Sequence, residues 1–186
     1  TITGRRLEVL QDVAGDGLFP LAMDVTDESA QRDTIAKAVA ARGPIQICVA
    51  NAGIAEGRAL QKTEMDLWRK IMATNLDGAF ITIREAMRSM VDTDWGRVIA
   101  VSSIAGIRGL KGGGAYAASK HALEGFFKSL RSEERPHGVR CVIAAPSFVA
   151  TNIGAVADRA DGIARPGSAP DGVDYMTPDR AARITG

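Results

Sequence analysis

Short apolar runs alternate along the chain with longer segments whose apolar residues recur at helical spacing. The runs are almost unbroken, which is typical of strands in a buried parallel sheet. They cover residues 18–23, 45–50, 96–101 and 139–145, and residues 1–4 have the character of the tail of another strand. The helical segments cover residues 7–14, 30–39, 67–72, 80–90 and 115–135. This alternation predicts an α/β domain with a doubly wound parallel sheet and helices on both faces, spanning residues 1–186.

Capping and helix-breaking residues mark the ends of these elements. Asp27 can cap the second helical segment, and Gly43 ends it. Gly78 interrupts a long helical pattern at a cost of about 1 kcal/mol relative to alanine, so we expect close packing or a bend there. Residues 146–178 are rich in Gly, Ala, Asp and Pro and predict a long loop.

Polar residues gather where the predicted strands end. Asp24, Asn51 to Gly53, Ser103 and residues 146–151 each follow an apolar run directly. In doubly wound sheets ligands bind beyond the carboxyl ends of the strands. These residues are therefore expected to share one site.

The composition is that of a globular protein without a dominant charge. Of the 186 residues, 46% are hydrophobic, and 23 Lys and Arg nearly balance 22 Asp and Glu. No global field favours nucleic acid or an anionic membrane, and no stretch approaches the roughly 20 apolar residues of a membrane span. Cys48 and Cys141 lie in predicted strands, where we expect buried free thiols and a reducing compartment. The expected location is the cytoplasm.

The stretch from Ser103 to Lys120 carries the clearest chemistry. Tyr116 and Lys120 are four residues apart, so on a helix both side chains project from one face. A phenol with a pKa near ~10 is a poor proton donor or acceptor at neutral pH, and an adjacent ammonium favours the phenolate. Tyr116 is thus a candidate general acid or base. The glycine-rich loop after Ser103 can fold back to bring that hydroxyl beside the phenol.

Asn51-Ala52-Gly53, Asn75, Ser103 and the segment YAASK with Tyr116 and Lys120 together resemble the short-chain dehydrogenase/reductase family. The resemblance implies a Rossmann-like fold with three α/β/α layers, a nicotinamide cofactor, and reversible hydride transfer between a carbonyl and an alcohol. It implies that Tyr116 is the general acid or base and that Lys120 lowers its pKa and binds the cofactor ribose. Ser103 would donate to the reacting oxygen, and Asn75 would hold a water that links Lys120 to solvent.

The same resemblance assigns cofactor contacts along the chain. Asp24 and Val25 would contact the adenine, although Asp24 can instead be a local cap before Thr26. Arg5 and Arg6 follow the strand tail at residues 1–4, where the adenosine ribose is expected. Guanidinium groups suit a 2′-phosphate, so NADP(H) is preferred over NAD(H). The alternative is that both arginines are solvated charges at a helix start. The remaining expected cofactor contacts are Asn51, Ala52, Gly53, Tyr116, Lys120, Pro146 and Thr151.

The sequence also departs from the family pattern. The glycine-rich turn after the first strand has no counterpart, and we expect that strand to be absent with it, together with about 30 residues at the start. Because that strand is central, its absence would leave two edges unpaired in a domain of low stability alone. We also expect the C-terminal end to be cut relative to the family. Ser147 stands where the family usually has glycine.

Three functional readings remain open on the sequence. The preferred one is an NADP(H)-dependent carbonyl reductase or alcohol dehydrogenase acting on a small molecule. A catalytically silent dinucleotide-binding or scaffold protein and a dehydratase or epimerase are the alternatives. We expect a homo-dimer or homo-tetramer by analogy with family members, formed through the helices at 76–90 and 115–135. His121 and His137 lack metal-ligand partners at useful spacing, so no metal is expected.

Overall fold

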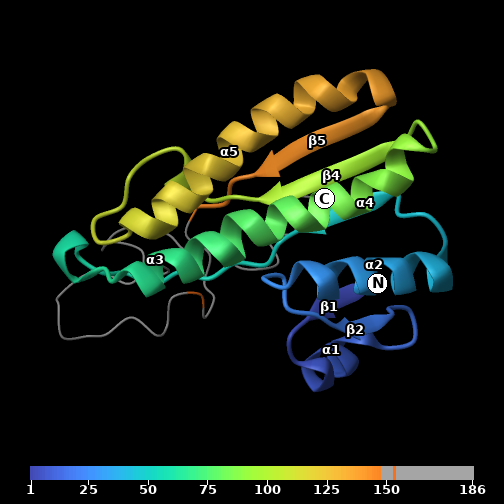
Figure 1. The fold of residues 1–186 in the computed structure, drawn as a ribbon, viewed down its shortest axis with the longest axis horizontal. Coiled ribbons are helices and arrows are strands. Elements are labelled where there is room, and N and C mark those ends of the chain that lie inside the picture. Colours follow the sequence, from blue (N-terminus) through green and yellow to red (C-terminus); the bar gives the residue numbers. More distant parts are fainter. Residues whose placement is uncertain (148–152, 154–186) are drawn as a thin grey trace.

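The computed structural model describes residues 1–147 and residue 153. Within them strands and helices alternate as the apolar pattern predicts (Figure 1). The strands are β1 (Ile2–Gly4), β2 (Pro20–Ala22), β3 (Ile47–Ala50), β4 (Gly96–Val101) and β5 (Val139–Ala144). The helices are α1 (Leu7–Ala14), α2 (Glu28–Arg42), α3 (Met65–Met72), α4 (Gly78–Val91) and α5 (Gly114–Glu134).

All strand pairs in the described part of the chain are parallel, and they form two separate sheets. One sheet has the order β1-β2 and the other the order β3-β4-β5. No pairing joins β1 to β3 within these residues, which confirms the expectation of two unpaired central edges. A cavity of about 280 Å³ lies along both edges, lined by Thr1 and Thr3 on one side and Ile47 and Val49 on the other.

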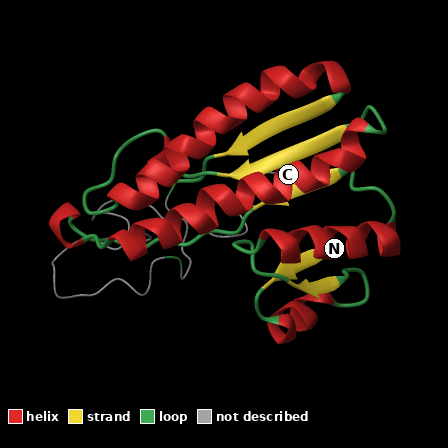
Figure 2. Ribbon diagram, in the orientation of Figure 1, coloured by secondary structure: helices red, strands yellow, loops and turns green. Residues whose placement is uncertain are grey.

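The main core lies between the larger sheet and two long helices. Helices α4 and α5 cover one face of the β3-β4-β5 sheet (Figure 2). Val98 of β4, Ile83 of α4 and Phe127 of α5 are completely buried in this core. Alternate strand residues face the other way, so Ile47 and Val142 remain about half exposed. The smaller β1-β2 sheet lies between α1 and α2 (Figure 1).

Cys48 of β3 and Cys141 of β5 are buried in the same core as free thiols. Burial raises the pKa of Cys48 to about 12, so this thiol stays protonated at neutral pH. It therefore acts as a small apolar side chain, as its position in the sequence predicts.

The predicted cap on α2 is present. The Asp27 side chain accepts a hydrogen bond from the Ala30 amide at 3.0 Å, and Gly43 ends the helix with its amide bonded to the Val39 carbonyl. Of the close packing or bend expected at Gly78, the structure has the close packing, since a Cβ there would lie 2.9 Å from the Val25 carbonyl oxygen. A π-helical turn, Ala73–Asp77, joins α3 to α4 directly before Gly78.

Neither a membrane-spanning helix nor a cluster of metal ligands is found among residues 1–147 and 153. None of the helices there is long and apolar enough to cross a membrane. In the same residues no group of three or more His, Cys, Asp or Glu side chains is placed to hold a metal ion.

Gly138→Ala is expected to destabilise the fold strongly. Gly138 has φ +71°, and a Cβ there would lie 2.0 Å from the Asp94 carbonyl oxygen, so backbone must move. We expect the free energy of unfolding to fall by about 2–4 kcal/mol in urea titrations. Gly125→Ala is the control, because a Cβ there meets no atom within 4 Å and should raise helix stability by about 0.5–1 kcal/mol. Equal effects of the two substitutions would contradict this account of Gly138.

Candidate active site

Asn75 lies at the centre of the predicted site, on the π-helical turn before α4. Its side chain is 1% exposed. Oδ1 accepts from the Ile54 amide at 2.8 Å, while Nδ2 donates to the Ile54 carbonyl at 2.9 Å and to Ser119 Oγ at 3.0 Å. The single-residue bulge of a π-turn turns this side chain away from the ordinary helical positions and toward the sheet edge. Both amide hydrogens are used, and Oδ1 retains a second lone pair that can accept from a water.

Ser103, Tyr116 and Lys120 come together as the sequence predicts. Tyr116 lies in the first turn of α5, and Ser103 is near enough to its hydroxyl to lower its pKa. Lys120 lies one turn later, with Nζ 5.8 Å from the centre of the Tyr116 ring. The Ser103 hydroxyl also accepts from the Ala105 amide at 3.1 Å, which fixes the start of the loop.

Burial sets the proton affinities of this pair. It raises the pKa of Tyr116, and the Ser103 hydroxyl offsets part of that rise. Burial also lowers the pKa of Lys120 to about 8. The expected lowering of the Tyr116 pKa by Lys120 is therefore not found in the structure. Lys120 Nζ donates instead to the Val101 carbonyl at 2.7 Å, and desolvation dominates for both groups.

The segment Asn51-Ala52-Gly53 follows β3 and passes close to two of these side chains. A Cβ on Gly53 would lie 3.4 Å from Asn75 Oδ1 and 3.7 Å from Lys120 Nζ. The main chain at Gly53 therefore lies within ordinary contact distance of both polar groups. The approach of Gly53 to the cofactor stays a prediction.

The carboxyl end of β5 is joined to the same loop. The Ile104 amide donates to the Pro146 carbonyl at 3.0 Å, and the Ser102 amide donates to the Ala144 carbonyl at 2.7 Å. These bonds hold Pro146 beside the residue that follows Ser103. Thr151, the other cofactor contact expected from this segment, lies outside the described residues.

Arg5, Arg6, Asp24 and Val25 lie at the carboxyl ends of β1 and β2. Asp24 Oδ1 accepts from both the amide and the hydroxyl of Thr26, at 2.9 and 2.7 Å. The Thr26 amide, then the hydroxyl, and more weakly the Arg5 charge hold the pKa of Asp24 below its usual range. This geometry is the local cap considered for Asp24, and its contact with adenine stays a prediction. Both arginines are exposed.

Sequence reasoning missed Ser119, which links two expected site residues. Ser119 is completely buried, accepts from Asn75 Nδ2, and donates to the Tyr116 carbonyl at 2.7 Å. It stands directly before Lys120, one turn after Tyr116. A small polar residue on the buried face of a helix, beside the tyrosine expected to be catalytic, is the signal that points to it.

Comparisons with known proteins match most of the chain. The sequence profile of the short chain dehydrogenase family matches residues 3–161. The chain is 32% identical over 190 residues to the 3-oxoacyl-[acyl-carrier-protein] reductase of Escherichia coli K12, covering 96% of this chain and 78% of the reductase. It is 37% identical over 156 residues to an oxidoreductase of Myxococcus xanthus, and there the match spans 81% of this chain and 62% of the relative.

Solved structures share the arrangement of strands and helices. A metagenomic short-chain oxidoreductase in complex with NADP superposes with a TM-score of 0.74 at 30% identity, over 77% of this chain and 68% of that one. NAD⁺-bound xylitol dehydrogenase superposes with a TM-score of 0.76 at 24% identity, over 80% of this chain and 60% of that one. The second likeness shows the fold alone.

Lys120→Met is expected to change how stability depends on pH. Burial lowers the pKa of Lys120 from 10.5 to about 8, so between these values the unfolded chain binds more protons than the folded one. The burial penalty is therefore full below about pH 8 and is relieved as pH rises toward the unfolded value. Relative to Lys120→Met, the wild type should gain about 1–3 kcal/mol of unfolding free energy between about pH 7 and about pH 10 in urea titrations.

The control for this experiment is Lys128→Met, at an exposed lysine of the same helix. Its pH profile should run parallel to that of the wild type. Parallel profiles for the wild type and Lys120→Met would contradict the buried position of the ammonium.

Proposed function

The chain belongs to the short-chain dehydrogenase family, and on this premise we propose that it transfers a hydride between NADP(H) and a carbonyl or alcohol substrate. One observation carries the proposal. The side chain of Asn75 is bonded through Ser119 to the helix that bears Tyr116 and Lys120, and Ser103 is near enough to the Tyr116 hydroxyl to lower its pKa. A surface pair or a turn serine would not need this buried polar connection.

The groups in this cluster suit a nicotinamide dinucleotide. The Lys120 ammonium and the Tyr116 hydroxyl are donors for a ribose, and Gly53 leaves the space beside them that a Cβ would fill. Arg5 and Arg6 offer exposed guanidinium groups for phosphate. When bound, the cofactor supplies or accepts the hydride.

Tyr116 is the proton donor or acceptor at the substrate oxygen. Its raised pKa keeps the hydroxyl protonated at neutral pH, which suits donation during carbonyl reduction. Ser103 donates to the same oxygen as negative charge develops there. Bringing both hydroxyls to one oxygen requires the fixed loop that starts at Ser103, and the hydrogen bond from the Ala105 amide supports that role.

Lys120 and Asn75 replace the proton that Tyr116 gives up. With a pKa of about 8, Lys120 is mostly protonated at neutral pH yet can release a proton at modest cost. The remaining lone pair of Asn75 Oδ1 is placed to hold a water next to Gly53, within the same group of atoms. A proton can then pass from solvent through this water and Lys120 to Tyr116.

Cofactor preference and assembly complete the proposal. We infer NADP(H) from Arg5 and Arg6 and from the lack of an acidic residue at Thr3 or Gly4, with NAD(H) as the alternative. We infer a homo-dimer or homo-tetramer formed through α4 and α5, supported by the 42% exposure of Phe80 on α4. A cytoplasmic location is inferred from the two free cysteines.

Tyr116→Phe is expected to abolish most of the activity. Removing the hydroxyl leaves no group to exchange a proton with the substrate oxygen, so kcat should fall about 10²–10⁴-fold in a carbonyl-reduction assay followed by NADPH absorbance. Binding of NADPH, followed by its fluorescence, should change by less than about threefold, because the ring and Lys120 remain. Full turnover by Tyr116→Phe would contradict the proposal. Binding of NADPH without turnover by the wild type would favour the alternative of a catalytically silent dinucleotide-binding protein.

Arg5→Glu tests the phosphate assignment. Reversing this charge should raise the Kd for NADPH about 10-fold or more and that for NADH less than about threefold. Arg140→Glu on β5 makes the same change of charge away from the expected cofactor site and should leave the ratio of the two affinities unaltered. An equal loss for NADPH and NADH in Arg5→Glu would contradict a 2′-phosphate contact.

A further inference from the structure

Gln31 of α2 is a completely buried amide whose hydrogen bonds reach two other segments. Nε2 donates to the Val25 carbonyl at 2.6 Å and to the Gly78 carbonyl at 3.1 Å. Oε1 accepts from the Thr82 hydroxyl at 2.5 Å. Both amide hydrogens and the carbonyl oxygen are therefore engaged, and the side chain is 0% exposed.

The two segments that Gln31 joins are in direct contact. A Cβ on Gly78 would lie 2.9 Å from the Val25 carbonyl oxygen and 2.9 Å from its Cγ2, so only glycine lets them approach this closely. The buried Val25 carbonyl oxygen needs a donor, and the Gly78 carbonyl oxygen also accepts from the Thr82 hydroxyl at 2.8 Å. A planar amide with two N–H groups reaches both carbonyl oxygens from one side chain, and an apolar residue of the same length bonds to neither.

Gly78 is also tied to the expected catalytic centre. It is the first residue of α4 and follows the π-helical turn that carries Asn75. Val25 follows Asp24 at the carboxyl end of β2, where the adenine end of the cofactor is expected. Gln31 thus bridges two segments. One is the Asp24–Val25 segment, expected at the adenine end of the cofactor, and the other is the start of α4, which directly follows the turn that carries Asn75.

We propose that Gln31 is a positioning residue that holds the Asp24–Val25 segment at a fixed place relative to Asn75. This assignment rests on the proposed function for its effect on cofactor binding, while the bridge itself is independent of it. Loss of the bridge lets the Asp24–Val25 segment move away from α4, which weakens dinucleotide binding and leaves the groups around Tyr116 in place.

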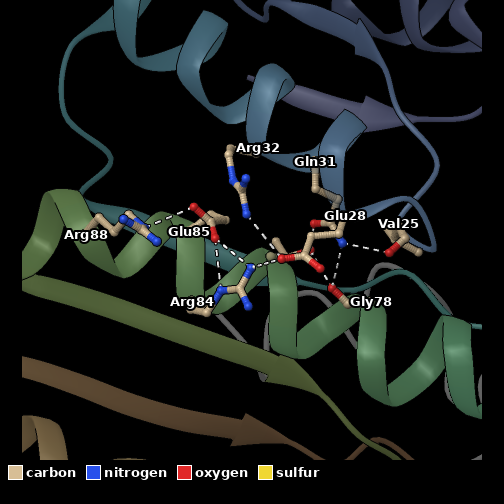
Figure 3. A network of polar contacts seen from close by, with 9 residues as sticks. Val25, Glu28, Gln31, Arg32, Gly78, Arg84, Glu85 and Arg88 are labelled. Carbon is tan, nitrogen blue, oxygen red and sulfur yellow. Dashed lines mark hydrogen bonds and ion pairs between the residues drawn. The ribbon is translucent and has the colours of Figure 1, made fainter.

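A neighbouring ion-pair network joins the same two helices but does not replace this bridge. Glu28 of α2 pairs with Arg84 of α4 at 2.7 Å, and Arg84 also pairs with Glu85 (Figure 3). Glu28 is half exposed and the Arg84 side chain is 35% exposed, so solvent screens their attraction. This pair links α2 to α4 without contacting Val25. Breaking the Glu28–Arg84 ion pair is therefore a matched control for the substitution of Gln31.

The variant Gln31→Met in the full chain distinguishes a local positioning role of Gln31 from an effect on the stability of the whole fold. Methionine keeps the length of the side chain and removes every hydrogen bond. Amide hydrogen exchange by mass spectrometry should be about 10-fold faster over residues 24–27, without any cofactor present. In turnover assays KM for the dinucleotide should rise about 5–10-fold with kcat within about twofold of the wild type.

Two further variants keep the test decisive. Thr82→Val removes the hydroxyl that contacts Gln31 Oε1 and the Gly78 carbonyl, and it leaves both bonds of Gln31 Nε2 in place. It should give a smaller change in the same direction, even if Gln31→Met fails to fold. Glu28→Gln should leave both the exchange rate over residues 24–27 and KM unaltered.

Each other outcome overturns a named part of the account. Unchanged exchange over residues 24–27 in both Gln31→Met and Thr82→Val overturns the bridge. A fall in kcat with KM unchanged shows loss of folded protein only and overturns the positioning role. If the wild type neither binds NADPH or NADH nor turns over, the proposed function fails, and the exchange measurement alone still decides whether Gln31 holds the segment.

Discussion

One buried amide, that of Asn75, joins the segments on which the expected chemistry depends. It bonds to both the amide and the carbonyl of Ile54, after β3, and through Ser119 it reaches the helix of Tyr116. Leaving a buried amide of this kind unpaired costs about 1–3 kcal/mol, so the three segments are held in one arrangement. The positions of Tyr116 and Lys120 relative to the sheet edge follow from that constraint.

Burial, rather than attraction between the two side chains, governs the proton affinities at this centre. Desolvation raises the pKa of Tyr116 and lowers that of Lys120 to about 8, so the ammonium loses its proton well before the phenol does. A tyrosine that stays protonated beside a lysine poised near neutral pH suits proton delivery during reduction. The same logic explains why Ser103 matters, because it is the group that partly offsets the burial of the phenol.

Much of the fold followed from the apolar pattern, and the rest depended on tertiary contacts. The strand over residues 96–101 and the cap by Asp27 were predictable because each has a local cause. Two unpaired sheet edges were predictable because the order of strands in doubly wound sheets is known. The π-turn at Asn75 and the bridge of Gln31 were not, since periodicity does not register one extra residue or a long-range amide contact. For Asp24, the local cap considered beside the cofactor contact is the geometry found, and Thr151 lies beyond the described chain.

The central claim is hydride transfer with Tyr116 as the proton donor. The most direct measurement is product labelling: the protein is incubated with a panel of small ketones and NADPH carrying deuterium at the transferable position of nicotinamide C4, and the alcohols are analysed by mass spectrometry. The account predicts one deuterium on the carbinol carbon of the product from the wild type and none above background from Tyr116→Phe. Equal labelling by both proteins, or oxidation of NADPH with no deuterium in any alcohol, would contradict it.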